Sequence, residues 1–433
     1  MTGSAADEPP PSWVHRLVAA GAFLLPALSL AIPSGYSWGA LCLVFAGLLA
    51  AGPVLRRPGG WTAPWRWLLG SIAAMGLVWL LRLDLQWHAL RAGDFDRFAK
   101  YLLALMAAPA LMRTAPPLTW TLRGCWVGAW LAAAVAGWQV HALGLDRAHG
   151  DTNAIQFGNV AVLLALWSAL AAWRARTRWE RWAAIGAVLA GSYASLLSGA
   201  RGGWWVLAAL LILLALAAWR GYLPGGRAAA SSSSPHRGPI GTVATVFALA
   251  IGGLIWVAND SSLNQRLEAL QRDLQLYRQG DAETSVGHRL AHWRLAWHMG
   301  LERPGLGWSE AGYEQRKREW VEAGQAPAVV LRFGHAHHEW LDLWAKAGAV
   351  GVLALALFYG VPAVIHCRHL RRRHPSDDRS WAAWAGLMLV LGYLGFGMTQ
   401  AMFAHNSGNL VYLFMNLVWA SMVLRPAAVE GDR

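Results

Sequence analysis

Gly334-His335-Ala336-His337-His338-Glu339-Trp340-Leu341 marks the point where a polar segment meets a long apolar one. The polar segment runs from about residue 259 to residue 346, and apolar stretches lie on both sides of it. Apolar runs of roughly 20 residues, long enough to cross the hydrocarbon core of a bilayer, recur along the chain. The sequence therefore predicts a membrane protein that holds a group of histidines just outside the bilayer.

The composition supports this class of protein. Hydrophobic residues make up 56% of the chain and charged residues 14%, whereas an ordinary soluble domain has about 25% charged residues. Each run is apolar on all sides, so helices are the expected spanning elements rather than barrel strands. We predict an all-α polytopic membrane protein with about twelve transmembrane helices and one helical segment outside the bilayer. The predicted spans cover approximately residues 15–33, 38–55, 66–83, 98–113, 122–142, 155–173, 182–198, 203–219, 240–258, 347–366, 381–401 and 408–424.

Loop charges predict the orientation of these spans. Arginines gather in the loops after the second, fourth, sixth, eighth and tenth spans, and arginine-rich loops are typically cytoplasmic. Both termini are then cytoplasmic, and the polar segment lies on the opposite side, which is the periplasm if the host is a Gram-negative bacterium. We predict three parts: helices one to nine (1–258), a periplasmic catalytic segment (259–346), and helices ten to twelve with a cytoplasmic tail (347–433).

Other classes of protein are less well supported. The net charge of +13 comes mainly from arginines in short loops, which membrane topology explains without a nucleic-acid partner. The three cysteines are far apart and form no disulfide framework. The polar start of the chain and the first apolar run indicate a retained span rather than a cleaved signal peptide. The 28 tryptophans fit aromatic belts at the membrane interfaces, although some could stack on sugar rings.

Arginines on the outer side are not explained by topology. Arg201 lies in Ser198-Gly199-Ala200-Arg201-Gly202-Gly203-Trp204, a short turn between two spans. Its glycines let the backbone approach a ligand closely, and a guanidinium offers a fork of donors that matches phosphate oxygens. The alternative is an arginine that reaches lipid phosphates or stabilises the turn.

A second outer arginine lies in a predicted helix that Ser285 could cap. Arg289, Trp293 and Trp297 share one face of this helix at i, i+4 and i+8 spacing. An arginine on an aromatic face requires an anionic partner, either a protein carboxylate or a substrate phosphate. Arg266, which precedes the helix, is a further candidate for substrate binding, although a solvated helix face also explains it.

His337 is the strongest candidate for proton transfer, because the pKa of histidine lies near neutrality. Its spacing from Leu341 and Trp344 predicts one face of a helix that leads into the tenth span. A structural histidine at a helix start is the alternative. A zinc site is a competing interpretation, since His335 and His338 lie close by, and His288 and His292 are spaced i, i+4. Because no HExxH motif and no nearby cysteine occurs, we expect no metal.

Two smaller groups of outer residues are further candidates for the site that contains His337. Arg97 and Lys100 lie on the outer side, close enough to the fourth span to meet a lipid phosphate, although a loop with ion pairs also explains them. His405 and Asn406 lie in the last outer loop.

The chain resembles the O-antigen ligases of lipopolysaccharide assembly, whose superfamily includes O-antigen polymerases and protein O-oligosaccharyltransferases. The turn at Arg201, the stretch with Arg289, Trp293 and Pro304-Gly305-Leu306-Gly307, and Ala336-His337-His338-Glu339-Trp340-Leu341 followed by Ala347-Gly348-Ala349-Val350-Gly351 carry the resemblance. Asn153-Ala154-Ile155-Gln156-Phe157-Gly158 also fits the pattern. The chain departs from it at His338, where relatives often have asparagine.

The resemblance implies transfer of an O-antigen polysaccharide from undecaprenyl diphosphate to a sugar hydroxyl of lipid A-core. Arg201 and Arg289, helped by Arg266, would hold the diphosphate, and His337 would activate the acceptor hydroxyl. His338, Trp293, Arg97 and Lys100 are the further residues that we expect to contact substrate. Direct attack would invert the anomeric carbon, and arginines would replace a divalent metal, so neither metal nor cofactor is expected.

Three alternatives remain open from the sequence. An O-antigen polymerase and a protein O-oligosaccharyltransferase would use the same lipid-linked donor with a different acceptor. A twelve-span transporter belongs to another class, but it would typically show internal repeats and charged or broken helices at mid-membrane. The conspicuous charges here lie instead at the outer boundary of the predicted membrane region.

Overall fold

The computed structural model describes residues 11–55, 61–83, 92–223, 271–273, 275–279, 281–371 and 378–425. These residues form helices and no strand, so the predicted all-α class is confirmed for them. The helices are α1 (Ser12–Leu28), α2 (Gly35–Leu55), α3 (Ala63–Leu81), α4 (Asp96–Arg113), α5 (Leu118–Gly137), α6 (Ala154–Arg174), α7 (Arg178–Ser198), α8 (Arg201–Trp219), α11 (Ser285–Glu302), α12 (Ser309–Glu322), α13 (Glu339–Arg371), α14 (Asp378–Gly397) and α15 (Asn406–Leu424). Short helical turns cover Ala92–Phe95, Trp138–Ala142, Ala328–Arg332 and Met402–Ala404.

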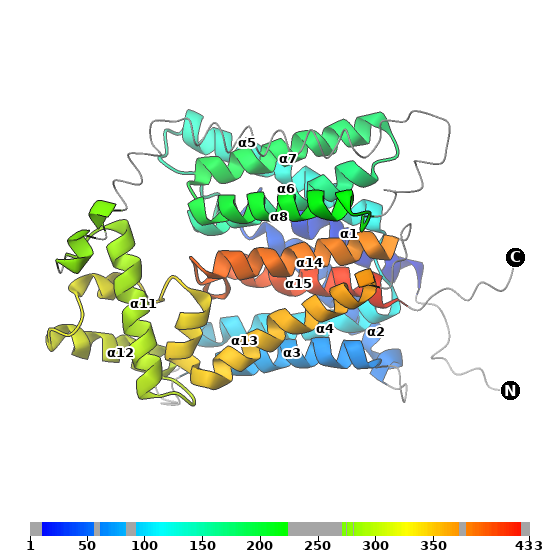
Figure 1. Cartoon of the computed structure of the whole chain (residues 1–433). Coiled ribbons are helices and arrows are strands. Elements are labelled where there is room, and N and C mark those ends of the chain that lie inside the picture. Colours follow the sequence, from blue (N-terminus) through cyan, green and yellow to red (C-terminus); the bar gives the residue numbers. More distant parts are fainter. Residues whose placement is uncertain are drawn as a thin grey trace, which may run out of the picture.

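Most of these helices run side by side as one bundle (Figure 1). Within the described ranges, seven are long and apolar enough to cross a membrane, namely α2, α3, α6, α8, α13, α14 and α15. Helices α1, α4, α5 and α7 lie at further predicted spans but do not meet the same criteria of length and hydropathy. The predicted span at 240–258 lies outside the described residues, so the total of twelve stays a prediction. The apolar helices indicate a multi-pass membrane protein.

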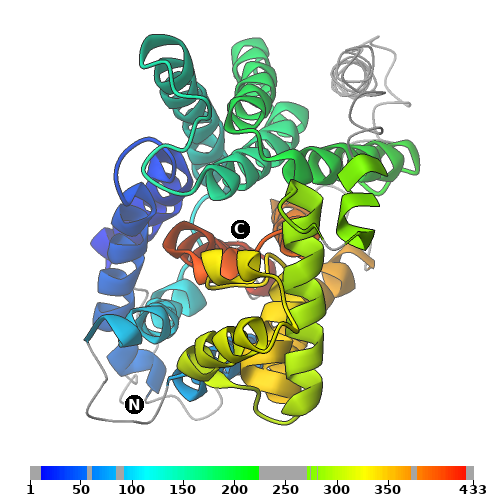
Figure 2. The ribbon, with the colours of Figure 1, turned by 90° about the vertical axis from the view of Figure 1, so that its left-hand side faces the viewer.

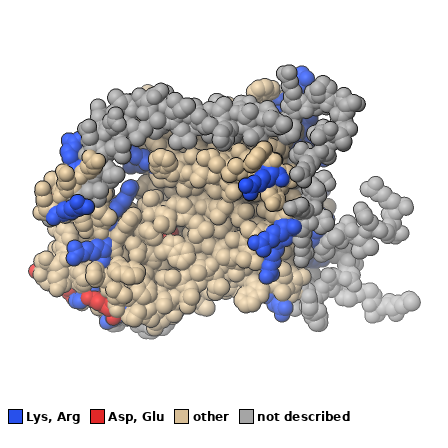
Figure 3. Space-filling model, in the orientation of Figure 1, with Lys and Arg blue, Asp and Glu red and all other residues tan. Residues whose placement is uncertain are grey.

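The surface agrees with a membrane position for the bundle. On the face in Figure 3, a broad uncharged region separates groups of Lys and Arg that lie toward the two ends. Many large apolar side chains on the bundle are exposed, including Leu41 and Phe45 of α2 and Leu353 of α13. Because lipid tails can cover such side chains without cost, their exposure is expected for spanning helices.

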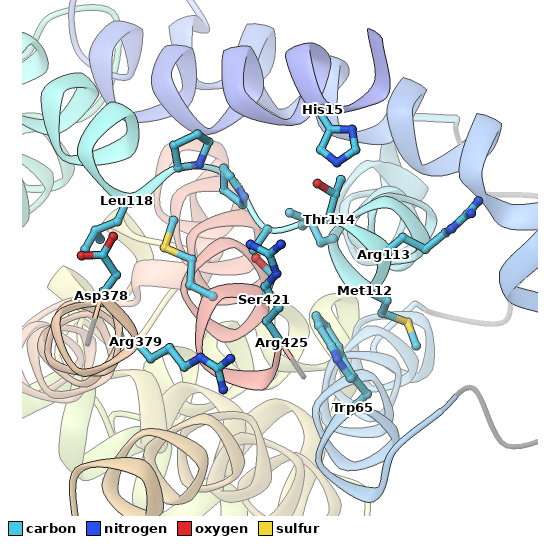
Figure 4. A pocket seen from close by; sticks show the side chains of 15 residues that line it. His15, Trp65, Met112, Arg113, Thr114, Leu118, Asp378, Arg379, Ser421 and Arg425 are labelled. Atoms are coloured by element: carbon cyan, nitrogen blue, oxygen red, sulfur yellow. The ribbon is translucent and has the colours of Figure 1, made fainter. Parts of the chain in front are cut away.

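One end of the bundle carries arginine-lined cavities. Ends of α1, α3, α4, α5, α14 and α15 surround a cavity of about 820 Å³, which Arg113, Arg379 and Arg425 help to line (Figure 4). A neighbouring cavity of about 480 Å³ is lined in part by Arg123 and Arg174. We call this the arginine end. Arginines of the loops after the predicted fourth, sixth and tenth spans therefore lie at this one end.

The helices α11 and α12 lie beyond the opposite end. Near the start of α3, Trp65 lines the larger arginine-end cavity. At the other end of α3, its C-cap residue Arg82 pairs with Glu310 of α12 and Asp342 of α13. Figure 2 shows α11 and α12 across this end of the bundle, beside the start of α13. We call this end of the bundle the histidine end, because the segment with His335, His337 and His338 directly precedes α13.

A glycine-rich contact joins α11 to the bundle. Helix α13 is kinked at Gly348, whose φ of 59° and ψ of −152° suit only glycine. The loop after α11 pairs with this kink, because Ala349 N–H donates to the Pro304 carbonyl at 2.7 Å. Trp308 N–H donates to the Ala345 carbonyl at 3.0 Å. The two glycine-containing motifs of the sequence, far apart along the chain, therefore form one joint.

The centre of the bundle is made by α6 and α15, most of whose residues are buried. The rings of Trp167 and Trp419 lie 5.7 Å apart where these helices meet. Toward the histidine end, Phe403 stacks on Tyr393 and packs against Tyr412. The aromatic packing gives the loop between α14 and α15 a rigid base directly beneath the histidines.

Replacing Gly348 with alanine tests the joint. A Cβ there would lie 2.5 Å from backbone atoms of Gly305, and the backbone would be strained. We expect Gly348→Ala to lower the free energy of unfolding by about 1–3 kcal/mol, measured with denaturant in detergent micelles. Gly360→Ala in the same helix is the matched control, because nothing lies within 4 Å of its Cβ position. Equal stability of the two variants would contradict the role of the kink.

Candidate active site

Four histidines gather at the histidine end, and we call them the histidine cluster. They are His292 of α11, His335 and His337 of the segment before α13, and His405 of the loop before α15. The ring of His337 lies 4.3 Å from that of His335 and 5.6 Å from that of His292, between centroids. The rings of His335 and His405 lie 5.8 Å apart. His337 therefore lies between two elements that are distant in the sequence.

The backbone at His337 is not helical, which corrects the prediction that it shares a helix face with Leu341 and Trp344. Helix α13 begins at Glu339, and His337 adopts a left-handed conformation with φ of 51°. Such a conformation is uncommon outside glycine, although histidine tolerates it better than most residues. The strain turns the imidazole toward the loop between α14 and α15, where the surrounding contacts hold it.

A network of four charges, of which Arg82, Asp342 and Lys346 are buried and Glu310 is partly exposed, fixes this segment. Arg82 pairs with Glu310 at 2.6 Å and with Asp342 at 3.3 Å, and Lys346 pairs with the same carboxylates at 3.0 and 3.1 Å. The network also binds backbone, since Lys346 donates to the Gly334 carbonyl at 2.6 Å. The Ala336 N–H donates to Asp342 at 3.0 Å. These bonds hold both sides of His335 and therefore place His337.

The loop between α14 and α15 supplies the other wall of the cluster. Gln400, which is 1% exposed, lies with its Oε1 3.2 Å from His337 Nδ1 and its Nε2 3.3 Å from His405 Nε2. The loop itself is held by Glu339, whose carboxylate accepts from the Phe403 N–H at 3.0 Å. This loop thus contacts the histidines from the bundle side.

Arg289 approaches from α11. This helix is capped by Thr284, which accepts from the Gly287 N–H at 3.0 Å, and not by Ser285 as predicted, because Ser285 is already the first helical residue. Burial lowers the pKa of Arg289 from its ordinary value, and the charge of Arg201 lowers it further. Within the described parts of the chain, no carboxylate pairs with Arg289. The half-buried guanidinium of Arg289 and the nearby guanidinium of Arg201 together favour the binding of an anion.

Arg201 lies at the first turn of α8, where it is exposed and where the described residues give it no ion pair. The N-terminus of a helix also favours negative charge. The neighbouring glycines serve packing, because the Cβ positions of Gly202 and Gly203 would collide with Thr399 and Asn159. Sequence reasoning assigned that space to a ligand, whereas protein side chains occupy it. The glycines bring Arg201 against the loop that holds Gln400.

The remaining predicted residues lie in different surroundings. Arg97 is 3.7 Å from Glu310, and its charge helps to lower the pKa of His405, so it borders the histidine cluster. Lys100 is buried and pairs with Asp96, so the structure does not leave its ammonium free. The ring of Trp293 lies 5.4 Å from that of His338. Arg266 lies outside the described residues.

Burial keeps the imidazoles neutral at neutral pH. It lowers the pKa of His292 and of His335 to about 3, and of His405 to about 4, with neighbouring positive charges adding to the effect. The pKa of His337 is also lowered by burial, while its hydrogen bond with Gln400 opposes the shift and Arg289 adds to it. A neutral imidazole can accept a proton, so His337 is in the form that a general base requires.

The same rings do not make a metal site of the usual kind. Among residues with described positions, no three His, Cys, Asp or Glu side chains are arranged to hold a metal ion. The adjacent rings of the histidine cluster meet edge-on at 74° to 77°, with Phe333 packed against His337. In the predicted pair of His288 and His292, His288 lies 3.7 Å from the carboxylate of Glu283.

The model of the O-antigen ligase family matches residues 185–356 of the chain. This match supports membership of the O-antigen ligase/polymerase superfamily. The matched stretch contains Arg201, Arg289 and His337, and so the resemblance drawn from these motifs is confirmed. The superfamily implies a membrane enzyme of the glycosyltransferase type, with a lipid-linked polysaccharide and a lipid acceptor as substrates.

A protein of Haemophilus influenzae is also similar to this chain. It is 25% identical over 394 residues, which are 88% of this chain and 92% of the relative, and its printed description is "uncharacterized protein". The likeness therefore extends through the helices on both sides of the matched stretch.

Sequence reasoning missed the residues that support the cluster. Arg82 is not among the predicted site residues, yet it is 2% exposed and central to the four-charge network. The i, i+4 spacing of Asp342 and Lys346, one of only three lysines, was an available signal for this network. Gln400 lay at the edge of a predicted span, and nothing in its local sequence distinguishes it.

Removing Arg82 tests the network. In Arg82→Met, Glu310 and Asp342 would face Lys346 alone, and losing one partner of a buried ion pair costs about 3–5 kcal/mol. We expect a loss of that size in the free energy of unfolding in micelles. Arg316→Met is the control, because Arg316 pairs with Glu302 and Glu319 on the surface, where such pairs contribute up to about 1 kcal/mol. A small loss in Arg82→Met would contradict the role of the network.

Proposed function

We propose that this protein is an O-antigen ligase of the bacterial inner membrane. It would transfer the O-antigen polysaccharide from undecaprenyl diphosphate to lipid A-core at the periplasmic face. The observation that carries the proposal is the position of the neutral His337 near Arg289, which in turn lies near Arg201. The charge of Arg289 helps to lower the pKa of His337, and the charge of Arg201 helps to lower the pKa of Arg289. A base next to two cations without carboxylate partners fits a reaction in which a hydroxyl attacks and a diphosphate leaves.

The chemistry follows from these groups. Arg201 and Arg289 would bind the diphosphate through charge-assisted hydrogen bonds, and Arg266 would help them. His337 would take the proton of a sugar hydroxyl on lipid A-core while that oxygen attacks the anomeric carbon of the donor. The bond between this carbon and the diphosphate oxygen breaks with its electron pair, and undecaprenyl diphosphate departs. Attack from the opposite side inverts the anomeric carbon, and the arginines stabilise the growing charge without a metal.

The other predicted contacts would serve substrate binding. Trp293 and His338, whose rings lie 5.4 Å apart, offer apolar faces on which a sugar can pack. Arg97, at the border of the histidine cluster, would meet an anionic group of the acceptor. Lys100 would reach a lipid phosphate only if it exchanged its bond with Asp96. The periplasmic segment 259–346 would supply the base, while the parts 1–258 and 347–433 supply Arg201 and Gln400.

Orientation follows from the arginine end. Its cavities are lined by arginines from several loops, and arginine-rich loops favour the cytoplasmic side. The histidine end would then face the periplasm, where both lipid-linked substrates present their sugars. Membrane lipids would surround the exposed apolar faces of the bundle.

A reconstituted transfer assay tests the proposal. Purified protein is mixed with undecaprenyl-diphosphate-linked glycan and lipid A-core in the presence of EDTA, and glycan on lipid A-core is measured. We expect activity in the wild type and a loss of about a hundredfold or more in His337→Gln and Arg289→Ala. The exposed Arg294→Ala on the same helix is the control and should retain activity.

Each other outcome has a defined meaning. Lengthening of the glycan on its lipid carrier would identify a polymerase instead of a ligase. Transfer to a protein acceptor would identify an oligosaccharyltransferase. Loss of wild-type activity in EDTA would contradict metal independence, and full activity of His337→Gln would exclude that residue as the base.

The pH dependence tests the protonation state of the base. Protonation of His337 removes the lone pair that accepts the proton, so activity is lost as the pH falls through its pKa. Because burial lowers this pKa, we expect the acid limb of kcat/KM to lie below pH 6.5, the ordinary value for histidine. A limb well above pH 6.5 would contradict the buried, neutral imidazole.

A further inference from the structure

Gln400 is bonded to two members of the histidine cluster at once. An amide oxygen only accepts hydrogen bonds and an amide nitrogen only donates them. Oε1 of Gln400 lies 3.2 Å from Nδ1 of His337, so Nδ1 carries the proton. Nε2 of Gln400 lies 3.3 Å from Nε2 of His405, so that nitrogen accepts. A single orientation of one amide therefore sets the tautomers of two neutral rings.

This orientation decides which nitrogen of His337 can act. With the proton on Nδ1, the lone pair lies on Nε2, and within the described residues Nε2 makes no hydrogen bond. Rotating the amide by half a turn would point its NH₂ group at Nδ1. The ring proton would then move to Nε2, and the ring could no longer take a proton there.

The chain around Gln400 holds its backbone in place, and the two hydrogen bonds to the histidines hold its amide. The backbone N–H groups of Thr399 and Gln400 both donate to the Phe396 carbonyl at 3.0 Å. Thr399 is packed against Gly202 so closely that a Cβ on that glycine would collide with it. Asn409 donates to the Phe403 carbonyl at 2.8 Å and closes the loop. Gln400 is thus held by backbone on both sides.

We propose that Gln400 is the positioning residue of the base: its amide keeps the proton of His337 on Nδ1 and leaves Nε2 to receive the proton of the acceptor hydroxyl. This inference rests on the proposed role of His337 as base. Gln400 itself touches neither the donor nor the reacting atoms in this scheme, because it acts through the imidazole. It is the counterpart, in a neutral form, of the carboxylate that orients a catalytic histidine in other enzymes.

Two substitutions separate positioning from packing. Gln400→Met keeps length but removes the acceptor, and we expect kcat to fall about ten- to a hundredfold with little change in the KM for the lipid-linked donor. Gln400→Glu keeps an acceptor for Nδ1, so kcat at high pH should largely survive. Its charge stabilises the protonated imidazole, so the acid limb should move up by about one pH unit or more.

Several other groups influence the pKa of His337 in the wild type, and therefore the position of the acid limb. The charged and titratable groups around His337 are Arg289, His288 and His292 of α11, Asp342 of α13, and the neighbouring His335 and His405. All of these are unchanged in both variants, so a difference between Gln400→Glu and Gln400→Met reports on the side chain at position 400.

Gln139→Met is the matched control. Gln139 is also a buried glutamine, but it donates to the Gly150 carbonyl and accepts from the His149 and Gly150 N–H groups. We expect it to lower stability without moving the acid limb. If Gln400→Met kept the wild-type kcat and pH profile, or if Gln400→Met and Gln400→Glu lost activity equally, Gln400 would be a packing residue only.

Solid-state NMR of protein with ¹⁵N-labelled histidine reads the tautomer without substrate. Subtracting the spectrum of His337→Gln identifies the two nitrogens of His337. We expect a protonated Nδ1 in the wild type and a mixture of tautomers in Gln400→Met. A protonated Nε2 in the wild type would overturn the inference whatever the activity. If the tautomer is as expected but the wild type transfers nothing to lipid A-core, the positioning contact stands and the proposed reaction fails.

Discussion

The paired charges of Arg82, Glu310, Asp342 and Lys346 are the constraint on which the rest of the histidine end depends. A buried charge is costly unless it is paired, so these four groups can satisfy one another only when α3, α12 and α13 are in place. Two of them also bind the backbone on either side of His335. The geometry of the proposed base is therefore determined by charges that take no part in the reaction.

The proposed site combines groups from distant stretches of the chain. Arg201 begins α8, Arg289 comes from α11 outside the bundle, and Gln400 comes from the loop before α15. The segment 259–346 does not contain all of these groups, because it holds Arg289 and three histidines of the cluster but not His405, Arg201 or Gln400. The joint at Gly348 is therefore functionally relevant, because it sets how α11 sits on the bundle.

Much of this arrangement could be predicted from the sequence. Long apolar runs indicate spanning helices, and outer arginines beside a histidine indicate a site for an anionic lipid head group. Two features could not be predicted. The left-handed backbone at His337 depends on tertiary bonds to Asp342 and Lys346, which helical spacing does not reveal. Gln400 meets His337 only because the bundle brings residues 63 positions apart together.

Gly202 lies between Arg201, at the proposed grip on the leaving group, and Thr399, the neighbour of Gln400 in the sequence. The contact leaves no space for the two elements to slide independently. In the proposed reaction, the residue that would hold the leaving diphosphate and the residue that would orient the base therefore belong to elements in direct contact. A side chain larger than glycine at position 202 would therefore disturb both sides of the proposed site at once.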